Sequence, residues 1–165
     1  MKDLLSSWNN HQALNDLAPE LKLYRGFAGH DPRKTIVISS PENRTPRDVP
    51  IEIQIMADNY FEEKFGIRFR QRGIFCSGDI SVARNYANSE ADVRVISALT
   101  DFGFCWSPKV KDLYESLPYF DGTEKTFHSF LESANYKTSD LEAAIRSGNE
   151  IILVGDEFSA RSIKD

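Results

Sequence analysis

The 165-residue sequence is poor in the features that build metal sites, disulfides and membrane spans. Its two cysteines, Cys76 and Cys105, lie in apolar segments without paired spacing, and its three histidines are scattered along the chain. We therefore expect buried free thiols, no disulfide and no metal site. There is no long apolar run and no signal-peptide pattern at residues 1–14. The sequence thus predicts a soluble, cytoplasmic protein that does not enter a membrane.

Common nucleotide-binding and catalytic motifs are also missing. The sequence has no Rossmann glycine fingerprint, no phosphate-binding P-loop and no Gly-x-Ser-x-Gly elbow, so a catalytic site must be sought elsewhere. With 25 acidic and 20 basic side chains, the net charge is −5, which argues against tight, non-specific binding of nucleic acid. A local basic stripe formed by Arg68, Arg70 and Arg72 is the alternative that this balance leaves open.

What the chain does contain suits one folded domain that spans residues 1–165. Hydrophobic residues make up 41% of the sequence and aromatic residues 12%. This share is enough to bury an ordinary apolar core, so wholesale disorder is not expected. The sequence shows no internal repeat and no low-complexity segment.

Apolar periodicity predicts helices interleaved with short strands. The helices are expected near residues 10–20, 51–65, 80–87, 107–113, 127–134 and 141–148. The strands are expected near residues 21–26, 73–78, 93–96, 102–106, 150–154 and 159–163. The proline-rich residues 29–50 are predicted to form a loop around one short apolar piece, Thr35–Ile38. Because helices and strands are interleaved without regular βαβ units, the predicted fold class is α+β.

Three of the predicted strands carry a polar residue at one end, namely Arg25, Ser77 and Glu150. Side chains at strand ends can converge on one cleft while the sheet fixes their positions. Glu150 is the most unusual of the three, because a carboxylate at the head of a buried strand is expensive to bury without a partner. The pattern therefore indicates a candidate site built around these residues.

Four short motifs resemble the ADP-ribosyltransferase superfamily. Leu23–Gly26 is similar to its first motif, in which Arg or His precedes a small residue at a strand end. Gly73–Ser77 resembles the middle strand, an aromatic residue followed by a serine. Ala83–Ala87 is similar to the helix of poly-ADP-ribose polymerases whose Asn-Tyr pair carries a nicotinamide-stacking ring. Asn149–Val154 resembles the final strand, which opens on the catalytic glutamate.

The order of these motifs and the chain length suit a minimal member of the superfamily. Residues 44–48 and 65–68 are in addition similar to small bacteriophage-encoded proteins of this type. The resemblance implies two small, mostly antiparallel sheets that form an NAD cleft, with helices packed outside. It makes Glu150 the catalytic carboxylate, which stabilises the oxocarbenium character of the ribose as nicotinamide leaves.

The resemblance also implies roles for five other residues. Ser77 would hydrogen-bond the ribose or orient the catalytic carboxylate. Arg25 would bind the diphosphate or the ribose through its rigid fork of donors. Gly26 would offer backbone groups to the nicotinamide amide, where a side chain would block the approach. Tyr86 would stack on the nicotinamide ring, with Phe75 supporting it.

Two positions depart from the superfamily pattern. Many arginine-modifying members carry Glu or Gln two residues before the catalytic glutamate, and this chain has Gly148 there. Arginine is therefore not the expected acceptor. The position of a nicotinamide-contacting serine in the polymerases is Ala83, so polymer formation is not expected either.

Each candidate residue also has an ordinary structural interpretation. Arg25 can be a surface residue or a purely structural partner of Glu150, and Ser77 can be a turn residue. Tyr86 lies on the apolar face of a predicted short helix, where core packing competes with ligand stacking. The remaining arginines of interest are interpreted as loop and surface charges, with contact to a phosphate or a nucleic-acid acceptor as the alternative; these are Arg44, Arg47, Arg68, Arg70 and Arg72.

The function that the resemblance implies is transfer of one ADP-ribose from NAD to a macromolecule. NAD is consumed as the donor, no metal is required, and the expected acceptor is a protein, which for a phage-encoded chain is a host protein in the host cytoplasm. A nucleic-acid acceptor and NAD hydrolysis are alternatives. A further alternative is a non-catalytic module that keeps the fold and inhibits a host or defence protein. The sequence gives no oligomeric state.

Overall fold

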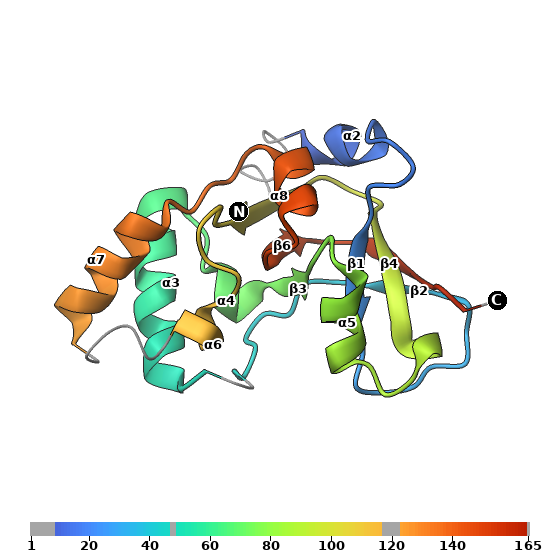
Figure 1. Cartoon of the computed structure of the whole chain (residues 1–165), viewed down its shortest axis with the longest axis horizontal. Coiled ribbons are helices and arrows are strands. Elements are labelled where there is room, and N and C mark those ends of the chain that lie inside the picture. Colours follow the sequence, from blue (N-terminus) through green and yellow to red (C-terminus); the bar gives the residue numbers. More distant parts are fainter. Residues whose placement is uncertain (1–8, 47–48, 117–122, 165) are drawn as a thin grey trace.

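The computed structural model describes residues 9–46, 49–116 and 123–164, which form an α+β fold with two small antiparallel sheets and flanking helices (Figure 1). The four-stranded sheet has the strand order β1-β4-β7-β2, and the three-stranded sheet has the order β3-β6-β5. The strands are β1 Leu23–Gly26, β2 Thr35–Ile38, β3 Ile74–Cys76, β4 Val93–Ala98, β5 Phe102–Trp106, β6 Ile151–Gly155 and β7 Phe158–Ser162. Each pair of neighbouring strands is antiparallel, so the predicted fold class and sheet type are confirmed.

The helices flank these sheets, and several of their predicted boundaries are confirmed. They are α2 Asn10–Asn15, α3 Ile51–Phe65, α4 Phe69–Arg72, α5 Ile80–Tyr86, the 3-10 helix Glu90–Asp92, α6 Leu113–Ser116, α7 Glu124–Ala134 and α8 Leu141–Ser147. Gly66 ends α3 in the left-handed conformation, with a φ of 80°. Asp79 caps α5, because its side chain accepts a hydrogen bond from the Ser81 backbone N–H at 2.9 Å. Among the helices described, none has the length and apolar character of a membrane span.

Two sequence predictions are wrong. Thr35–Ile38 is not part of a loop, because it pairs with β7 as the edge strand β2. The helix expected over residues 107–113 does not form as predicted. The hydroxyl of Ser107 accepts hydrogen bonds from the backbone N–H groups of Lys109 at 3.1 Å and Val110 at 3.0 Å, which favours a turn over a helix. Helix α6 follows only after this turn.

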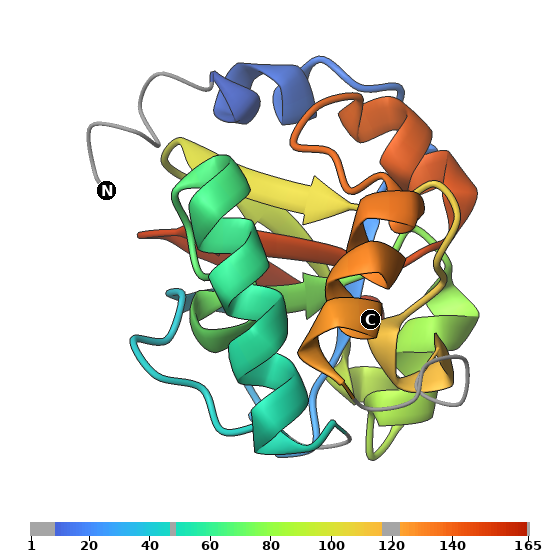
Figure 2. The same ribbon diagram turned by 90° about the vertical axis from the view of Figure 1, so that its left-hand side faces the viewer.

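The three-stranded sheet is buried on both faces because side chains on β6 alternate between two apolar clusters. Ile152 and Val154 belong to the cluster formed with α3, α4 and α7, whereas Ile151 and Leu153 belong to the cluster shared with the four-stranded sheet and α8. Figure 2 shows α3 and α7 in front of the strands, covering the first of these faces. Since alternate residues of a strand share a face, Glu150 at the head of β6 is expected on the side of α3 and α4.

The inner face of the four-stranded sheet changes from apolar to polar within two residues. Its apolar row consists of Leu23, Ile96 and Ala160, which pair across the strands and contribute to the shared cluster. In the next row on this face, Arg25 pairs with Arg94, which pairs in turn with Ser162. Residues that pair across antiparallel strands lie on the same face. The sheet therefore presents a polar row at one end of its inner face.

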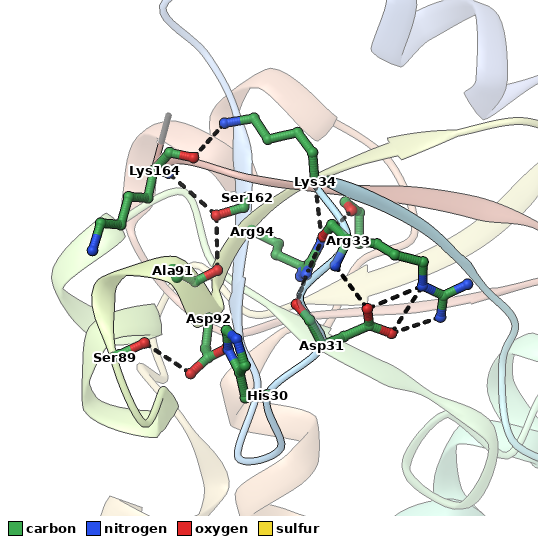
Figure 3. Close-up of polar contacts among 11 residues, drawn as sticks. His30, Asp31, Arg33, Lys34, Ser89, Ala91, Asp92, Arg94, Ser162 and Lys164 are labelled. Carbon is green, nitrogen blue, oxygen red and sulfur yellow. Dashed lines mark hydrogen bonds and ion pairs between the residues drawn. The ribbon is translucent and has the colours of Figure 1, made fainter.

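Arg94 fixes the connection between β1 and β2 onto the sheet (Figure 3). The residue is 2% exposed. Its Nη1 donates hydrogen bonds to the carbonyl oxygens of Lys34 at 3.1 Å and Ala160 at 3.0 Å. Its Nη2 donates to the carbonyl oxygens of Asp31 at 3.0 Å and Arg33 at 2.8 Å. A buried arginine is stable here because four carbonyl groups satisfy its planar fork of donors.

Replacing Arg94 by Met is expected to lower the free energy of unfolding by about 3 kcal/mol or more, because the four carbonyl groups lose a charged donor. Denaturation with urea measures this change. Arg161→Met is the matched control, since Arg161 lies on β7 with its side chain exposed, and it should stay within about 0.5 kcal/mol of the parent protein. Equal destabilisation by both substitutions would show that the Arg94 network does not hold the loop.

Candidate functional site

Backbone hydrogen bonds join β1 of the four-stranded sheet to the segment after β3 of the three-stranded sheet. The backbone N–H of Tyr24 donates to the carbonyl of Ser77 at 2.8 Å, and the N–H of Ser77 donates to the carbonyl of Tyr24 at 3.0 Å. This bridge places Arg25 and Gly26 next to Ser77. Two of the polar strand ends identified in the sequence are therefore neighbours in the fold.

A pocket of about 200 Å³ lies at this junction. Its wall includes all six site residues predicted from the sequence, which are Arg25, Gly26, Phe75, Ser77, Tyr86 and Glu150. Four of these residues lie in β1, β3 and α5. The other two are Ser77, which follows β3, and Glu150, which precedes β6. The structure thus brings together every residue of the predicted set.

Glu150 lies at the head of β6, with its side chain 21% exposed toward the pocket. Its backbone N–H donates to the carbonyl of Lys111 at 2.8 Å, which fixes the start of the strand. Its Oε1 accepts a hydrogen bond from Nη1 of Arg70 at 3.0 Å. Burial raises the pKa of Glu150 above its ordinary value; the charge of Arg70 opposes this shift and the charge of Asp112 adds to it.

Arg70 corrects two expectations. It was predicted to be a surface charge, yet it is 6% exposed, because the single turn of α4 directs it toward the head of β6. It also pairs with Glu150 in place of Arg25, whose structural pairing with Glu150 was the alternative interpretation. Arg68, Arg70 and Arg72 do not form one basic stripe, since the middle residue is buried and the outer two pair separately with Glu62 and Glu42.

Arg25 is held by β3. Its Nη1 donates to the carbonyl of Phe75 at 2.8 Å, and its guanidinium lies 5.2 Å from the ring centroid of Phe27. Burial lowers the pKa of Arg25, but an arginine remains a cation in proteins. The pocket therefore has a fixed positive charge on the side of β1.

Ser77 is buried and does not contact the Glu150 side chain directly. Its hydroxyl donates to the carbonyl of Gly148 at 2.8 Å and accepts from the backbone N–H of Asp79 at 3.0 Å. Ser77 is therefore more than a simple turn residue, because it ties the end of α8 to the start of α5. One lone pair of the hydroxyl remains for a further donor.

Glycine is required at two positions of the site for different physical reasons. Gly148 has a φ of 72°, a left-handed conformation that residues with a side chain rarely adopt. Gly26 allows close packing of α5, because a Cβ on it would lie 1.9 Å from the carbonyl oxygen of Ala83. In this structure the absence of a side chain at Gly26 thus permits the close approach of helix α5.

The two aromatic residues of the predicted set come from β3 and α5 and both line the pocket. Phe75 is half-buried, and the guanidinium carbons of Arg44 and Arg70 lie 3.9 Å and 4.9 Å from its ring centroid. Tyr86, on the last turn of α5, is 43% exposed and lines the pocket. Core packing, the alternative interpretation of Tyr86, is therefore wrong.

Sequence reasoning missed several polar residues of the pocket wall, namely Gln54, Lys111, Asp112 and Tyr114. Arg44 and Arg70, which were interpreted as surface charges with phosphate contact as the alternative, also line the wall. Arg44 is the one with a sequence signal, because it begins the Arg-Thr-Pro-Arg-Asp segment; Arg47 and Asp48 of that segment lie outside the described residues. The basic groups Arg25, Arg44, Arg70 and Lys111 outnumber the acidic groups Asp112 and Glu150. The pocket is therefore locally positive in a chain of net charge −5, which favours an anionic ligand.

Comparison of the chain with models of protein families, with curated proteins and with solved structures found no match. In the part of the chain that the structure describes, no three His, Cys, Asp or Glu side chains are grouped to hold a metal ion. Cys76 and Cys105 are both buried free thiols, as predicted.

Replacing Gly26 by Ala is expected to lower the free energy of unfolding by about 3 kcal/mol, because the added methyl group meets the backbone of α5 rather than a flexible side chain. Thermal and urea denaturation measure the loss. Gly29→Ala is the matched control, since a Cβ there has nothing within 4 Å, and it should be close to neutral. Similar stability of the two variants would show that β1 and α5 are not held in this close contact.

Proposed function

We propose that this protein cleaves the nicotinamide–ribose bond of NAD and transfers the ADP-ribose to a macromolecular acceptor. The observation that carries the proposal is the convergence of the predicted residues on one pocket. Four motifs that resemble those of ADP-ribosyltransferases are spread over residues 23–154. Each of them contributes at least one residue to the wall of the same pocket. The sheet arrangement, with two small antiparallel sheets around the junction, is compatible with the cleft that the resemblance implies.

The charges of the pocket support a donor that contains a diphosphate. Arg25 and Arg44 both contact Phe75, one through its carbonyl and the other over its ring. Two guanidinium groups in this arrangement can bind phosphate oxygens through paired hydrogen bonds. Tyr86, which is exposed and lines the pocket, offers a ring for stacking on nicotinamide. The free lone pair of Ser77 can accept a hydrogen bond from a ribose hydroxyl.

In the proposed reaction, the bond between ribose C1′ and nicotinamide N1 breaks heterolytically. The electron pair of the bond leaves with nicotinamide, and C1′ gains oxocarbenium character. The ionised carboxylate of Glu150 stabilises this charge in a site with little water. A lone pair of the acceptor then forms the new bond to C1′, and the proton of the acceptor passes to solvent. NAD is consumed, and no metal takes part in this scheme.

The expected acceptor is a protein, which would be a host protein if the chain is phage-encoded. A nucleic-acid acceptor is the alternative that the local positive charge favours. Gly148, with its left-handed backbone, lacks the Glu or Gln side chain that engages arginine in many members of the superfamily. Water is therefore a further candidate acceptor. Transfer of label from adenine-labelled NAD to protein or RNA in a cell extract separates these cases from hydrolysis. NAD that is neither bound nor cleaved, together with a co-purifying partner, would favour the non-catalytic inhibitory module.

Replacing Glu150 by Gln is expected to reduce nicotinamide release by at least about 100-fold, because the carboxylate that stabilises the transition state is lost. Chromatographic assay of free nicotinamide measures the rate. Glu157→Gln is the matched control, since Glu157 is an exposed residue in the connection between β6 and β7. Full activity in Glu150→Gln would refute the catalytic assignment.

The rate should also depend on pH in a specific direction. Because burial raises the pKa of Glu150 in the free protein, kcat/KM is expected to fall as the pH is lowered, already at pH values above the ordinary glutamate range. Protonation removes the negative charge that the transition state requires. The pH profile of kcat/KM measures the position of this acid limb. A limb at the ordinary glutamate value would contradict an ionised, buried Glu150 as the catalytic group.

A further inference from the structure

Helix α4 places one buried cation against the carboxylate of Glu150. Nη1 of Arg70 donates to Oε1 of Glu150 at 3.0 Å, and the same guanidinium lies 4.9 Å from the ring centroid of Phe75. Nε of Arg70 is buried and has no hydrogen-bond partner among the described residues. The guanidinium is thus held mainly by its contacts with the carboxylate and the aromatic ring, on the wall of the pocket.

A second buried carboxylate fixes the backbone of α4. Asp58, in α3, is 1% exposed. Its Oδ1 accepts from the backbone N–H of Arg70 at 2.8 Å, and its Oδ2 accepts from the backbone N–H of Gln71 at 2.8 Å. The first N–H groups of a helix have no partner within the helix, and Arg68 at the N-cap position supplies no side-chain cap. Asp58 therefore caps α4 from a different helix.

We propose that Asp58 and Arg70 act in series as positioning residues for Glu150. Asp58 fixes the backbone from which Arg70 extends, and Arg70 holds Oε1 so that Oε2 is presented to the ribose. This inference rests on the proposed cleavage of NAD. It is supported by the absence, within the described residues, of any hydrogen bond to Oε2, while the side chain lines the pocket. A carboxylate held at one oxygen loses less orientational freedom when substrate binds.

The charge of Arg70 supports the same role as its hydrogen bond to Glu150. Burial raises the pKa of Glu150, and Arg70 is the strongest opposing influence. The other charged groups that act on Glu150 are Asp112, which raises its pKa, and Arg44, which lowers it. Burial opposes the charge of Arg70 itself, but Glu150 and other neighbours raise the pKa of Arg70. Arg70 therefore favours the ionised form of the carboxylate that the reaction needs.

The test compares nicotinamide release by the Arg70→Gln, Arg70→Lys, Asp58→Asn and Arg68→Gln variants of the full chain. Arg70→Gln is expected to lower kcat by about 100-fold at neutral pH with little change in KM, and to move the acid limb to higher pH. Arg70→Lys keeps the charge and should restore the position of the limb. Asp58→Asn leaves one oxygen acceptor for two N–H groups, so it should lower kcat about tenfold with little change in KM.

Arg68→Gln is the control, because Arg68 belongs to the same segment but contacts Gln71 and Asn59 rather than Glu150. It should keep the parent kcat and the parent acid limb. Parent-like kcat and limb in both Arg70→Gln and Asp58→Asn would overturn the inference. If Arg70→Gln does not fold, as judged by circular dichroism, a parent kcat in Asp58→Asn would overturn it.

A readout without turnover separates this inference from the proposed function. Titration of the Glu150 carboxyl by carbon NMR should show a higher pKa in Arg70→Gln than in Arg68→Gln, because only the first loses the opposing charge. An unchanged titration overturns the role of Arg70 even if the parent protein is active. A parent protein that neither binds nor cleaves NAD refutes the proposed function, and with it the positioning role, while the titration still reports the Arg70–Glu150 contact.

Discussion

The two backbone hydrogen bonds between Tyr24 and Ser77 are the contact on which the rest of the site depends. They join the edge strand β1 of the four-stranded sheet to the end of β3 in the three-stranded sheet. Each sheet alone is small, and its inner face becomes stable only when the other sheet covers it. The pocket opens where this shared apolar packing ends and the polar row that contains Arg25 begins. A change in the close packing at this junction, for example at Gly26, therefore affects both the stability of the protein and the shape of the pocket.

The electrostatics of the pocket follow from the burial of one carboxylate. Glu150 heads a strand that is buried on both faces, and an unpaired carboxylate there would be unfavourable. Arg70 offsets this burial, and it is in turn held by the cap that Asp58 provides for α4. Arg25 and Arg44 add positive charge beside Phe75. A site of this kind can attract an anionic ligand and still present a carboxylate to it.

Local sequence patterns predicted the elements whose boundaries depend on nearby residues. The end of α3 at Gly66 and the cap of α5 by Asp79 are examples, because backbone conformation and capping act within one helical turn. Patterns failed where distant partners decide. Strand β2 exists because β7 pairs with it, and the hydroxyl of Ser107 donates to the carbonyl of Ala134 while it accepts from the backbone of the turn that follows it. The short helix α4 has too few residues to produce an apolar period.

The sequence by itself determined which residues belong to the candidate site on the strands. Arg25, Ser77 and Glu150 were identified as polar groups at the ends of apolar segments, and the fold brings them to one pocket. Only the tertiary structure decided their partners. Arg70 and Asp58 contact the site through side chains from α4 and α3, and hydrogen bonds between residues 80 positions apart, such as Arg70 and Glu150, leave no periodic signal in a sequence. Local sequence patterns predict local backbone structure, whereas the pairing of buried charges depends on how helices and strands from distant parts of the chain pack together.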